Sequence, residues 1–152
     1  MPTILCPYCH EQVDALAFPI HEAEHRMTRE DGQQNEYVTL PEDQRETGDL
    51  DGVPQVYVHQ KCGIATGMPE EIIRTYLKNP YIYSGDATYC CGCSTHVPNR
   101  ECVWTETGED LQTYMDKLRA AKPELKPKWY WKALMWIGIA VVAVAIAVFS
   151  KK

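Results

Sequence analysis

The sequence lacks the features that mark several common protein classes. Its first nine residues, Met-Pro-Thr-Ile-Leu-Cys-Pro-Tyr-Cys, have neither a basic start nor an apolar stretch, so we expect no secretory signal. No internal repeat is visible, and 152 residues are too few for a multi-domain enzyme. Because disulfides are not expected without export, clustered cysteines and histidines are interpreted as metal ligands.

Positive charge is scarce in the N-terminal third of the chain. Residues 1–51 contain three arginines, no lysine and twelve acidic residues, whereas the whole chain has a formal charge of −6. Binding to a phosphate backbone requires a basic surface. We therefore do not expect nucleic acid to be the main partner.

The chain contains seven cysteines and five histidines, and their positions suggest how the chain is divided into modules. We predict a zinc-finger-like module (1–29), an acidic loop region (30–52), a second zinc-binding α+β module (53–121), a linker (122–128) and a transmembrane helix (129–150). The loop region is expected to hold one brief extended piece, residues 37–40. The linker is expected to be stiff because Pro123 and Pro127 cannot lie inside a helix.

The first cluster pairs two cysteines with two histidines. Cys6-Pro-Tyr-Cys9 is followed by eleven residues and then by His21 and His25, which are four positions apart and so lie on one face of a helix. Four ligands of these types suit tetrahedral zinc. Residues 6–25 resemble the two-Cys two-His zinc finger, and the resemblance implies that these four residues bind zinc.

The same helix departs from the DNA-reading members of that family. They carry polar and basic residues on the exposed face, where this sequence has Glu22 and Glu24. Residues 21–25 also match the His-Glu-x-x-His motif of zinc proteases, with Glu22 as general base. A catalytic zinc needs an open coordination position, which Cys6 and Cys9 are placed to fill. A structural zinc is therefore the favoured interpretation, and a zinc hydrolase that uses His21, Glu22 and His25 is the alternative.

The second cluster combines two pairs of ligands far apart in the chain. His59-Gln-Lys-Cys62 and Cys90-Cys-Gly-Cys93 each have the two-residue gap of a zinc knuckle, and they predict a closed site of His59, Cys62, Cys90 and Cys93. Cys91, His96 and Cys102 are competing ligands. Redox catalysis by Cys90 and Cys93 is disfavoured because residues 94–98 do not continue as a helix.

Two helices are predicted in the second module. The first begins at Pro69 and ends at Asn79-Pro80, with an apolar face that includes Ile73 and Tyr76. The second begins at Thr107, which forms a capping-box pattern with Asp110, and stops at Pro123. Its apolar positions 111, 114, 115 and 118 are interpreted as core.

A long uncharged run lies near the C-terminus. Residues 133–149 contain no charge, follow an aromatic segment that starts at Trp129, and precede Lys151 and Lys152. The length and composition predict a membrane-spanning helix. Six basic residues in 117–132 against two after the run predict that the N-terminal domain faces the cytoplasm.

Together these features predict a small α+β domain with zinc knuckles, short strands and two or three helices, plus one C-terminal transmembrane helix. Two zinc ions are expected to be structural, because residues 1–52 are too polar to build a core and metal binding can supply the folding free energy. The expected role is protein–protein interaction or assembly at the cytoplasmic face of a membrane, as a tail-anchored protein. The expected partners are the lipid bilayer and another protein, with no small-molecule substrate evident. Catalysis by a hydrolase and nucleic-acid binding by the finger are the alternatives.

Overall fold

The structure of the protein is a computed structural model, which describes residues 1–83 and 85–127. This part of the chain contains three α-helices and seven short strands. In chain order they are β1 (Thr3–Leu5), β2 (Gln12–Asp14), α1 (Phe18–His25), β3 (Val56–His59), β4 (Ala65–Gly67), α2 (Glu70–Lys78), β5 (Ala87–Cys90), β6 (Thr95–Pro98), β7 (Cys102–Trp104) and α3 (Leu111–Ala121). Single 3₁₀ turns cover Glu42–Gln44, Asn99–Glu101 and Pro123–Leu125.

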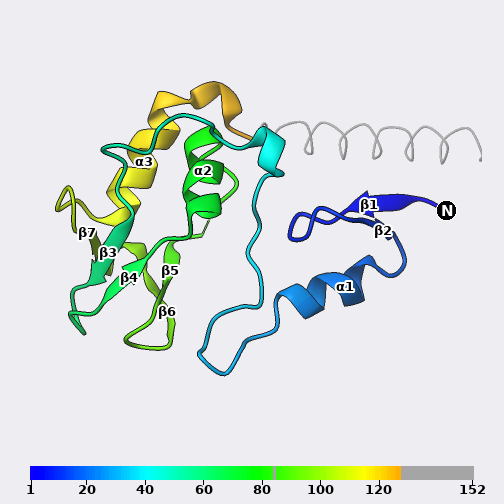
Figure 1. Ribbon diagram of the computed structural model, residues 1–152, viewed down its shortest axis with the longest axis horizontal. Coiled ribbons are helices and arrows are strands. Elements are labelled where there is room, and N and C mark those ends of the chain that lie inside the picture. Colours follow the sequence, from blue (N-terminus) through cyan, green and yellow to red (C-terminus); the bar gives the residue numbers. More distant parts are fainter. Residues whose placement is uncertain (84, 128–152) are drawn as a thin grey trace, which may run out of the picture.

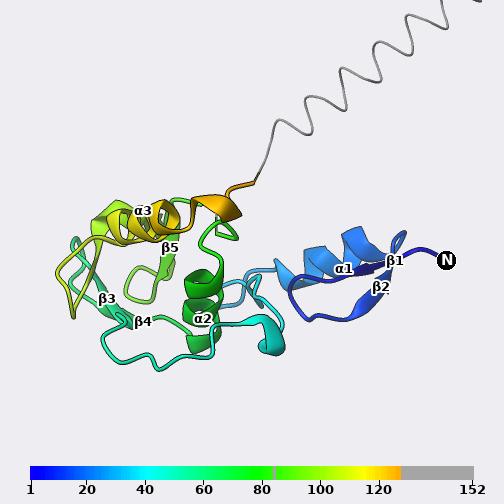
Figure 2. The ribbon, with the colours of Figure 1, turned by 90° about the horizontal axis from the view of Figure 1, so that it is seen from above.

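The strands form three small antiparallel sheets. β1 pairs with β2, β5 pairs with β6, and β3 is the central strand of a three-stranded sheet in the order β4-β3-β7. Figure 1 shows β1, β2 and α1 grouped at one end of the molecule, and the other strands with α2 and α3 at the other end. Figure 2 shows the same separation from above. We refer to residues 1–25 as the N-terminal unit and to residues 53–121 as the core unit.

The two predicted helices of the core unit are confirmed, with one change at a boundary. α2 has Pro69 as N-cap and Asn79 as C-cap, as the sequence predicts. α3 begins at Leu111 rather than at Thr107, because the Asp110 carboxylate accepts a hydrogen bond from the Thr113 N–H at 2.9 Å and is therefore the N-cap itself. The capping-box reading of Thr107 is wrong by one turn of helix.

The core unit is held together by a row of aromatic rings. Trp104 lies edge-on to Tyr57 and to Tyr114, and Tyr114 lies edge-on to Tyr76. Such rings bury large areas and prefer this T-shaped arrangement. The row connects the sheet to both helices, since Tyr57 and Trp104 come from β3 and β7, Tyr76 from α2 and Tyr114 from α3.

The N-terminal unit has almost no core of its own. Cys6 is its single buried side chain, and α1 buries none. Instead, the chain after α1 runs toward the core unit, where the Leu40 N–H donates to the Thr75 hydroxyl at 3.0 Å. Residues 37–40 form no strand, contrary to the prediction, since their backbone groups bond to side chains and loops rather than to a neighbouring strand.

The prediction of a transmembrane helix requires correction. The three α-helices have 8, 9 and 11 residues, whereas about 20 apolar residues are needed to cross a bilayer. No helix in the described part of the chain is both long and apolar enough to do so. This finding overturns the predicted fold class of an α+β domain plus a membrane helix, and with it the predicted single-pass membrane localisation. Residues 129–150, to which that helix was assigned, lie outside the described residues.

Candidate metal centres

Two groups of four cysteine and histidine side chains converge in the structure. One consists of Cys6, Cys9, His21 and His25, and the other of His59, Cys62, Cys90 and Cys93. Within each group, one nitrogen or sulfur atom from every residue lies within 4.8 Å of the others. These are the eight residues that the sequence spacing singles out as metal ligands.

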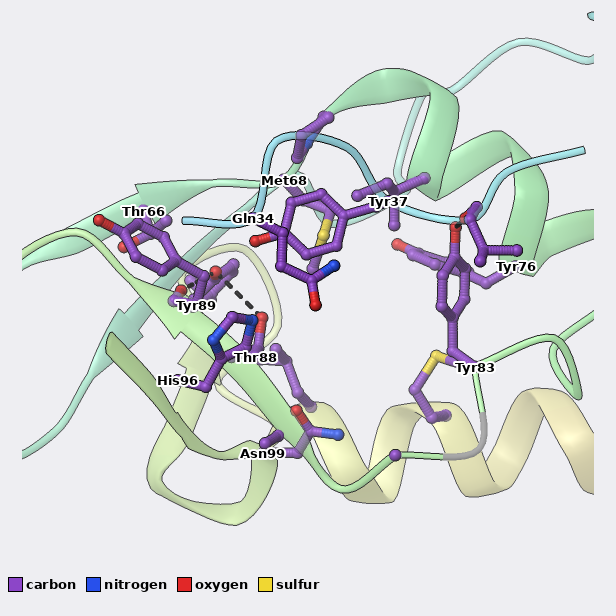
Figure 3. Close-up of a pocket in the computed structure, with 18 of the residues that line it drawn as sticks. Gln34, Tyr37, Thr66, Met68, Tyr76, Tyr83, Thr88, Tyr89, His96 and Asn99 are labelled. Atoms are coloured by element: carbon purple, nitrogen blue, oxygen red, sulfur yellow. Dashed lines mark hydrogen bonds between the residues drawn. The ribbon is translucent and has the colours of Figure 1, made fainter. Parts of the chain in front are cut away.

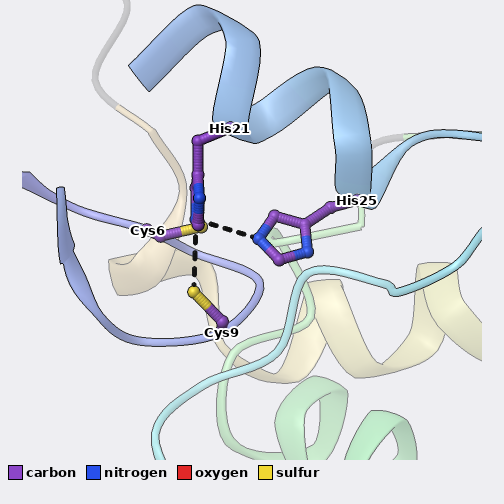
Figure 4. Close-up of side chains that lie close together, drawn as sticks. All are labelled: Cys6, Cys9, His21 and His25. Carbon is purple, nitrogen blue, oxygen red and sulfur yellow. Dashed lines mark hydrogen bonds between the residues drawn. The ribbon is translucent and has the colours of Figure 1, made fainter. Parts of the chain in front are cut away.

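The first centre lies between the β1–β2 hairpin and α1. The turn of the hairpin is closed by the Cys6 N–H, which donates to the Glu11 carbonyl at 2.8 Å, and by the His10 N–H, which donates to the Cys6 carbonyl at 3.0 Å. This tight turn directs both thiols toward α1. Pro19 lies in the first turn of α1, which presents His21 and His25 one turn apart (Figure 4).

The distances in this centre are compatible with four ligands around one metal ion. The His21 Nε2 atom lies 3.3 Å from the Cys9 Sγ atom and 3.0 Å from the His25 Nε2 atom (Figure 4). Two imidazole nitrogens and two sulfurs therefore face one point. A tetrahedral ion with bonds of about 2.0–2.3 Å would place its ligands at about this separation.

Glu36 orients one of the imidazoles. Its Oε2 atom lies 3.0 Å from the His25 Nδ1 atom. A proton on Nδ1 that donates to this carboxylate leaves the Nε2 lone pair directed at the centre of the cluster, which is the usual support for a metal-binding histidine. Tyr8 stacks on the same ring, with centroids 5.1 Å apart.

The second centre lies between the tips of two hairpins. His59 and Cys90 are the last residues of β3 and β5, and Cys62 and Cys93 lie in the turns that follow. The Cys62 and Cys90 sulfurs are 3.5 Å apart, and the Cys93 Sγ atom lies 3.3 Å from the His59 Nδ1 atom. The two ligand pairs are at least 28 residues apart in the sequence. They lie close together because the turns that follow β3 and β5 are in contact.

The close approach of these turns depends on Gly92. A Cβ atom at this position would lie 2.6 Å from the Ile64 side chain and 3.1 Å from the Cys62 sulfur. Only glycine leaves room for the other hairpin tip. The sequence analysis did not foresee that contact, because Ile64 belongs to the opposing hairpin.

A carboxylate also supports the histidine of the second centre. The His59 Nε2 atom lies 3.2 Å from Glu101 Oε2, and the Lys61 ammonium donates to Glu101 Oε1 at 2.7 Å. The Nδ1 atom is therefore left to face the three sulfurs. Hydrogen bonds from Lys61 and His59 hold the pKa of Glu101 below its ordinary value, so it is ionised at neutral pH.

The pKa values of Cys62 and Cys93 in the second centre are shifted in opposite directions. A hydrogen bond from the backbone N–H of Ile64 lowers the pKa of Cys62, whereas desolvation and the neighbouring thiols Cys90 and Cys62 raise the pKa of Cys93 to about 11. Three thiolates this close repel one another unless a cation lies between them. Binding of a divalent ion would therefore release protons from this centre.

The competing ligands lie elsewhere. Cys91 accepts a hydrogen bond from the Thr66 hydroxyl at 3.2 Å, His96 packs against Tyr89 with ring centroids 5.9 Å apart, and Cys102 is fully buried in the core opposite His59. Glu22, the general base of the alternative reading, is not part of the first group.

Sequence reasoning missed both carboxylates and one local regularity. Glu36 and Glu101 lie 11 and 42 residues from the histidines they support, and no spacing rule indicates them. In the three turns that carry ligands, the residue after the second ligand has a left-handed backbone, with φ of 62° at His10, 72° at Gly63 and 50° at Ser94. The three ligand-bearing turns therefore share one geometry, although no repeat is visible in the sequence.

Comparisons of the chain with protein-family models, with curated proteins and with solved structures find no match.

Proposed function

We propose that this protein is a zinc-binding module in which two zinc ions are structural. The observation that carries the proposal is the convergence of two four-ligand groups, each with a histidine whose second nitrogen faces a carboxylate. Thiolate and imidazole ligands in sets of four are typical of closed, structural zinc sites. Zinc would then replace the core that the N-terminal unit lacks, since Cys6 is its single buried side chain.

The closed ligand sets favour a structural role over catalysis. A hydrolytic zinc keeps one position for water, and the first centre has four protein ligands in place. Glu22 would then be an ordinary acid on α1. Replacing Glu22 by Gln should leave the zinc content and the unfolding midpoint of the first centre unchanged, whereas hydrolytic activity that depends on Glu22 would revive the alternative.

We further propose that the N-terminal unit binds another protein. Leu16 and Ile20 are 84% and 71% exposed, and Met27, just after α1, is 61% exposed. Large apolar side chains this exposed are common at protein-binding surfaces. The excess of acidic residues in 1–51 argues against nucleic acid as that partner.

Zinc content measured by native mass spectrometry and by elemental analysis tests the proposal. We expect two zinc ions for each full-length chain, one after Cys9→Ser and one after Cys62→Ser. Cys91→Ser is the matched control, because this cysteine lies between Cys90 and Cys93 in the sequence and its sulfur forms hydrogen bonds outside the second centre. This variant should retain two zinc ions. A chain that binds no zinc, or a control that loses one, would refute the assignment.

A further inference from the structure

The outer side of α1 carries a stripe of apolar side chains. Leu16, Ile20, Ala23 and Met27 follow one another at intervals of four, three and four residues, which is the spacing of one face of a helix. All four residues are exposed, although three of them have large apolar side chains. We refer to these four residues as the α1 stripe.

Turns at both ends of α1 extend this face beyond the helix itself. Before the helix, the Ala17 N–H donates to the Asp14 carbonyl at 3.0 Å, and after it the Met27 N–H donates to the Glu24 carbonyl at 3.3 Å. These bonds span three residues, as in a 3₁₀ turn, so the chain continues to coil on both sides of α1. The stripe is therefore about 16 Å long, which equals three turns of a helix.

The α1 stripe and the first metal centre lie on opposite sides of the helix. His21 and His25 point from α1 toward Cys6 and Cys9 (Figure 4). With 3.6 residues in each turn, the stripe lies roughly 150° around the helix from these two histidines. A zinc ion at the first centre would hold the inner side of α1 and leave the stripe facing outward. The inference below therefore rests on the proposed zinc site and on the proposed protein-binding role of this unit.

Negative charge predominates around the stripe. Residues 11–31 contain six acidic residues and two arginines. Arg29 forms an ion pair with Asp31 at 2.7 Å. The other five acidic residues of this stretch have no ion-pair partner among the described residues. One of them, Glu24, is exposed next to Ala23 and so lies at the edge of the stripe.

Arg26, the second arginine of this stretch, lies on the side of α1 toward the core unit. It lines a cavity of about 580 Å³ between the core unit and the segment that follows α1 (Figure 3). None of the four residues of the α1 stripe lines this cavity. The charge beside the stripe is therefore mainly negative.

Charge complementarity determines which partner fits this surface. A second copy of the chain would bring a like-charged surface, because residues 1–51 contain three arginines and twelve acidic residues. An anionic lipid surface would be repelled for the same reason. We propose that the α1 stripe binds an amphipathic helix of another protein, with apolar side chains on one face and lysine or arginine along its edges. Apolar positions at this spacing pack well against the same spacing on a partner helix.

Titration of the zinc-loaded, full-length chain with three synthetic helical peptides tests this proposal. The lysine peptide is two heptads long, with leucine at positions a and d and lysine elsewhere. The glutamate peptide has glutamate in place of each lysine, and the scrambled peptide has the lysine peptide's composition without an apolar face. The lysine peptide should shift the nuclear magnetic resonance signals of residues 16–27 and bind more weakly as salt is raised. The other two peptides should not shift them.

Single substitutions locate the binding surface. Ile20→Ser should weaken binding of the lysine peptide about tenfold, because the partner no longer buries an isoleucine side chain. Leu125→Ser is the matched control, since Leu125 is also exposed but lies in the turn after α3, and it should leave binding unchanged. Glu24→Lys should weaken binding at low salt, and the loss should diminish as salt is raised.

The zinc content of each sample separates this inference from the function on which it rests. A chain with two zinc ions that binds the lysine peptide no better than the scrambled peptide would overturn the inference and leave zinc binding intact. Binding of the glutamate peptide instead, or a dimer in sedimentation that Ile20→Ser abolishes, would retain the surface and overturn the basic partner. Loss of zinc in Ile20→Ser would show that this side chain stabilises the unit itself, and would also overturn the inference. A wild-type chain without zinc would refute the proposed function, and this inference with it.

Discussion

At the scale of single residues, each candidate metal centre includes a carboxylate outside its set of four ligands. Glu36 and Glu101 each hold one nitrogen of a histidine and so decide which nitrogen faces the cluster. His25 presents Nε2 and His59 presents Nδ1 for this reason. The order of ligands along the chain does not reveal this choice, although zinc affinity depends on it.

Replacing each carboxylate should weaken one centre only. Glu101→Ala is expected to lower zinc affinity at the second centre by about 10- to 100-fold, because the His59 ring loses its orienting partner. Glu101→Gln should have a smaller effect, since its amide oxygen can still accept the bond. Competition with a chromophoric chelator measures these affinities.

Glu36→Ala serves as the reciprocal control for that measurement. It should weaken the first centre and leave the second unchanged. If either variant altered both centres equally, the change would reflect general loss of stability rather than the orientation of one histidine.

At the scale of elements, short hairpins carry six of the eight candidate ligands, and α2 and α3 supply side chains to the core. Three of the four ligand pairs begin at or just after the last residue of a strand, so pairing with the neighbouring strand fixes the turn in which the second ligand lies. The fourth pair, His21 and His25, lies on α1. α3 supplies Leu111, Tyr114 and Met115 to the core, and its start is fixed by Asp110. Hydrogen bonds from the Thr113 N–H and hydroxyl hold the pKa of Asp110 below its ordinary value.

Removing this N-cap should lower the stability of the core unit and leave both candidate metal centres unchanged. Asp110→Ala is expected to lower the free energy of unfolding by about 1 kcal/mol, because the first turn of α3 loses its acceptor. Asp110→Asn is the control, since asparagine also caps helices and should change stability much less. Urea unfolding of the zinc-loaded protein at neutral pH measures both, and equal losses would rule out capping as the cause.

At the scale of the whole molecule, two parts of the chain fold for different reasons. The core unit buries an aromatic row, Tyr57, Trp104, Tyr114 and Tyr76, whereas the N-terminal unit buries little besides Cys6. Burial of apolar surface can offset ordering entropy in the first case and not in the second. The N-terminal unit should therefore depend far more strongly on zinc.

Removal of zinc should affect the N-terminal unit more than the core unit. With a strong chelator, amides of β1, β2 and α1 should lose protection from hydrogen exchange, while those of α2 and α3 retain more of theirs. The variant Cys9→Ser, which disables only the first centre, should reproduce the loss in α1 without chelator. Protection of α1 that survives chelation would contradict a structural role for zinc there.

The sequence by itself determined much of what depends on neighbours within about one turn of a helix or one knuckle. It identified the four ligand pairs, the helix that carries His21 and His25, and the limits of α2, because spacing and capping are local properties. It also predicted a membrane helix from the length and composition of residues 133–149, and no helix among the described residues is long and apolar enough to cross a membrane. Only the tertiary structure decided which pairs meet and that Glu36 and Glu101 support the histidines. Such contacts join residues far apart in the chain, and their distances are fixed by the packing of whole elements rather than by any local pattern.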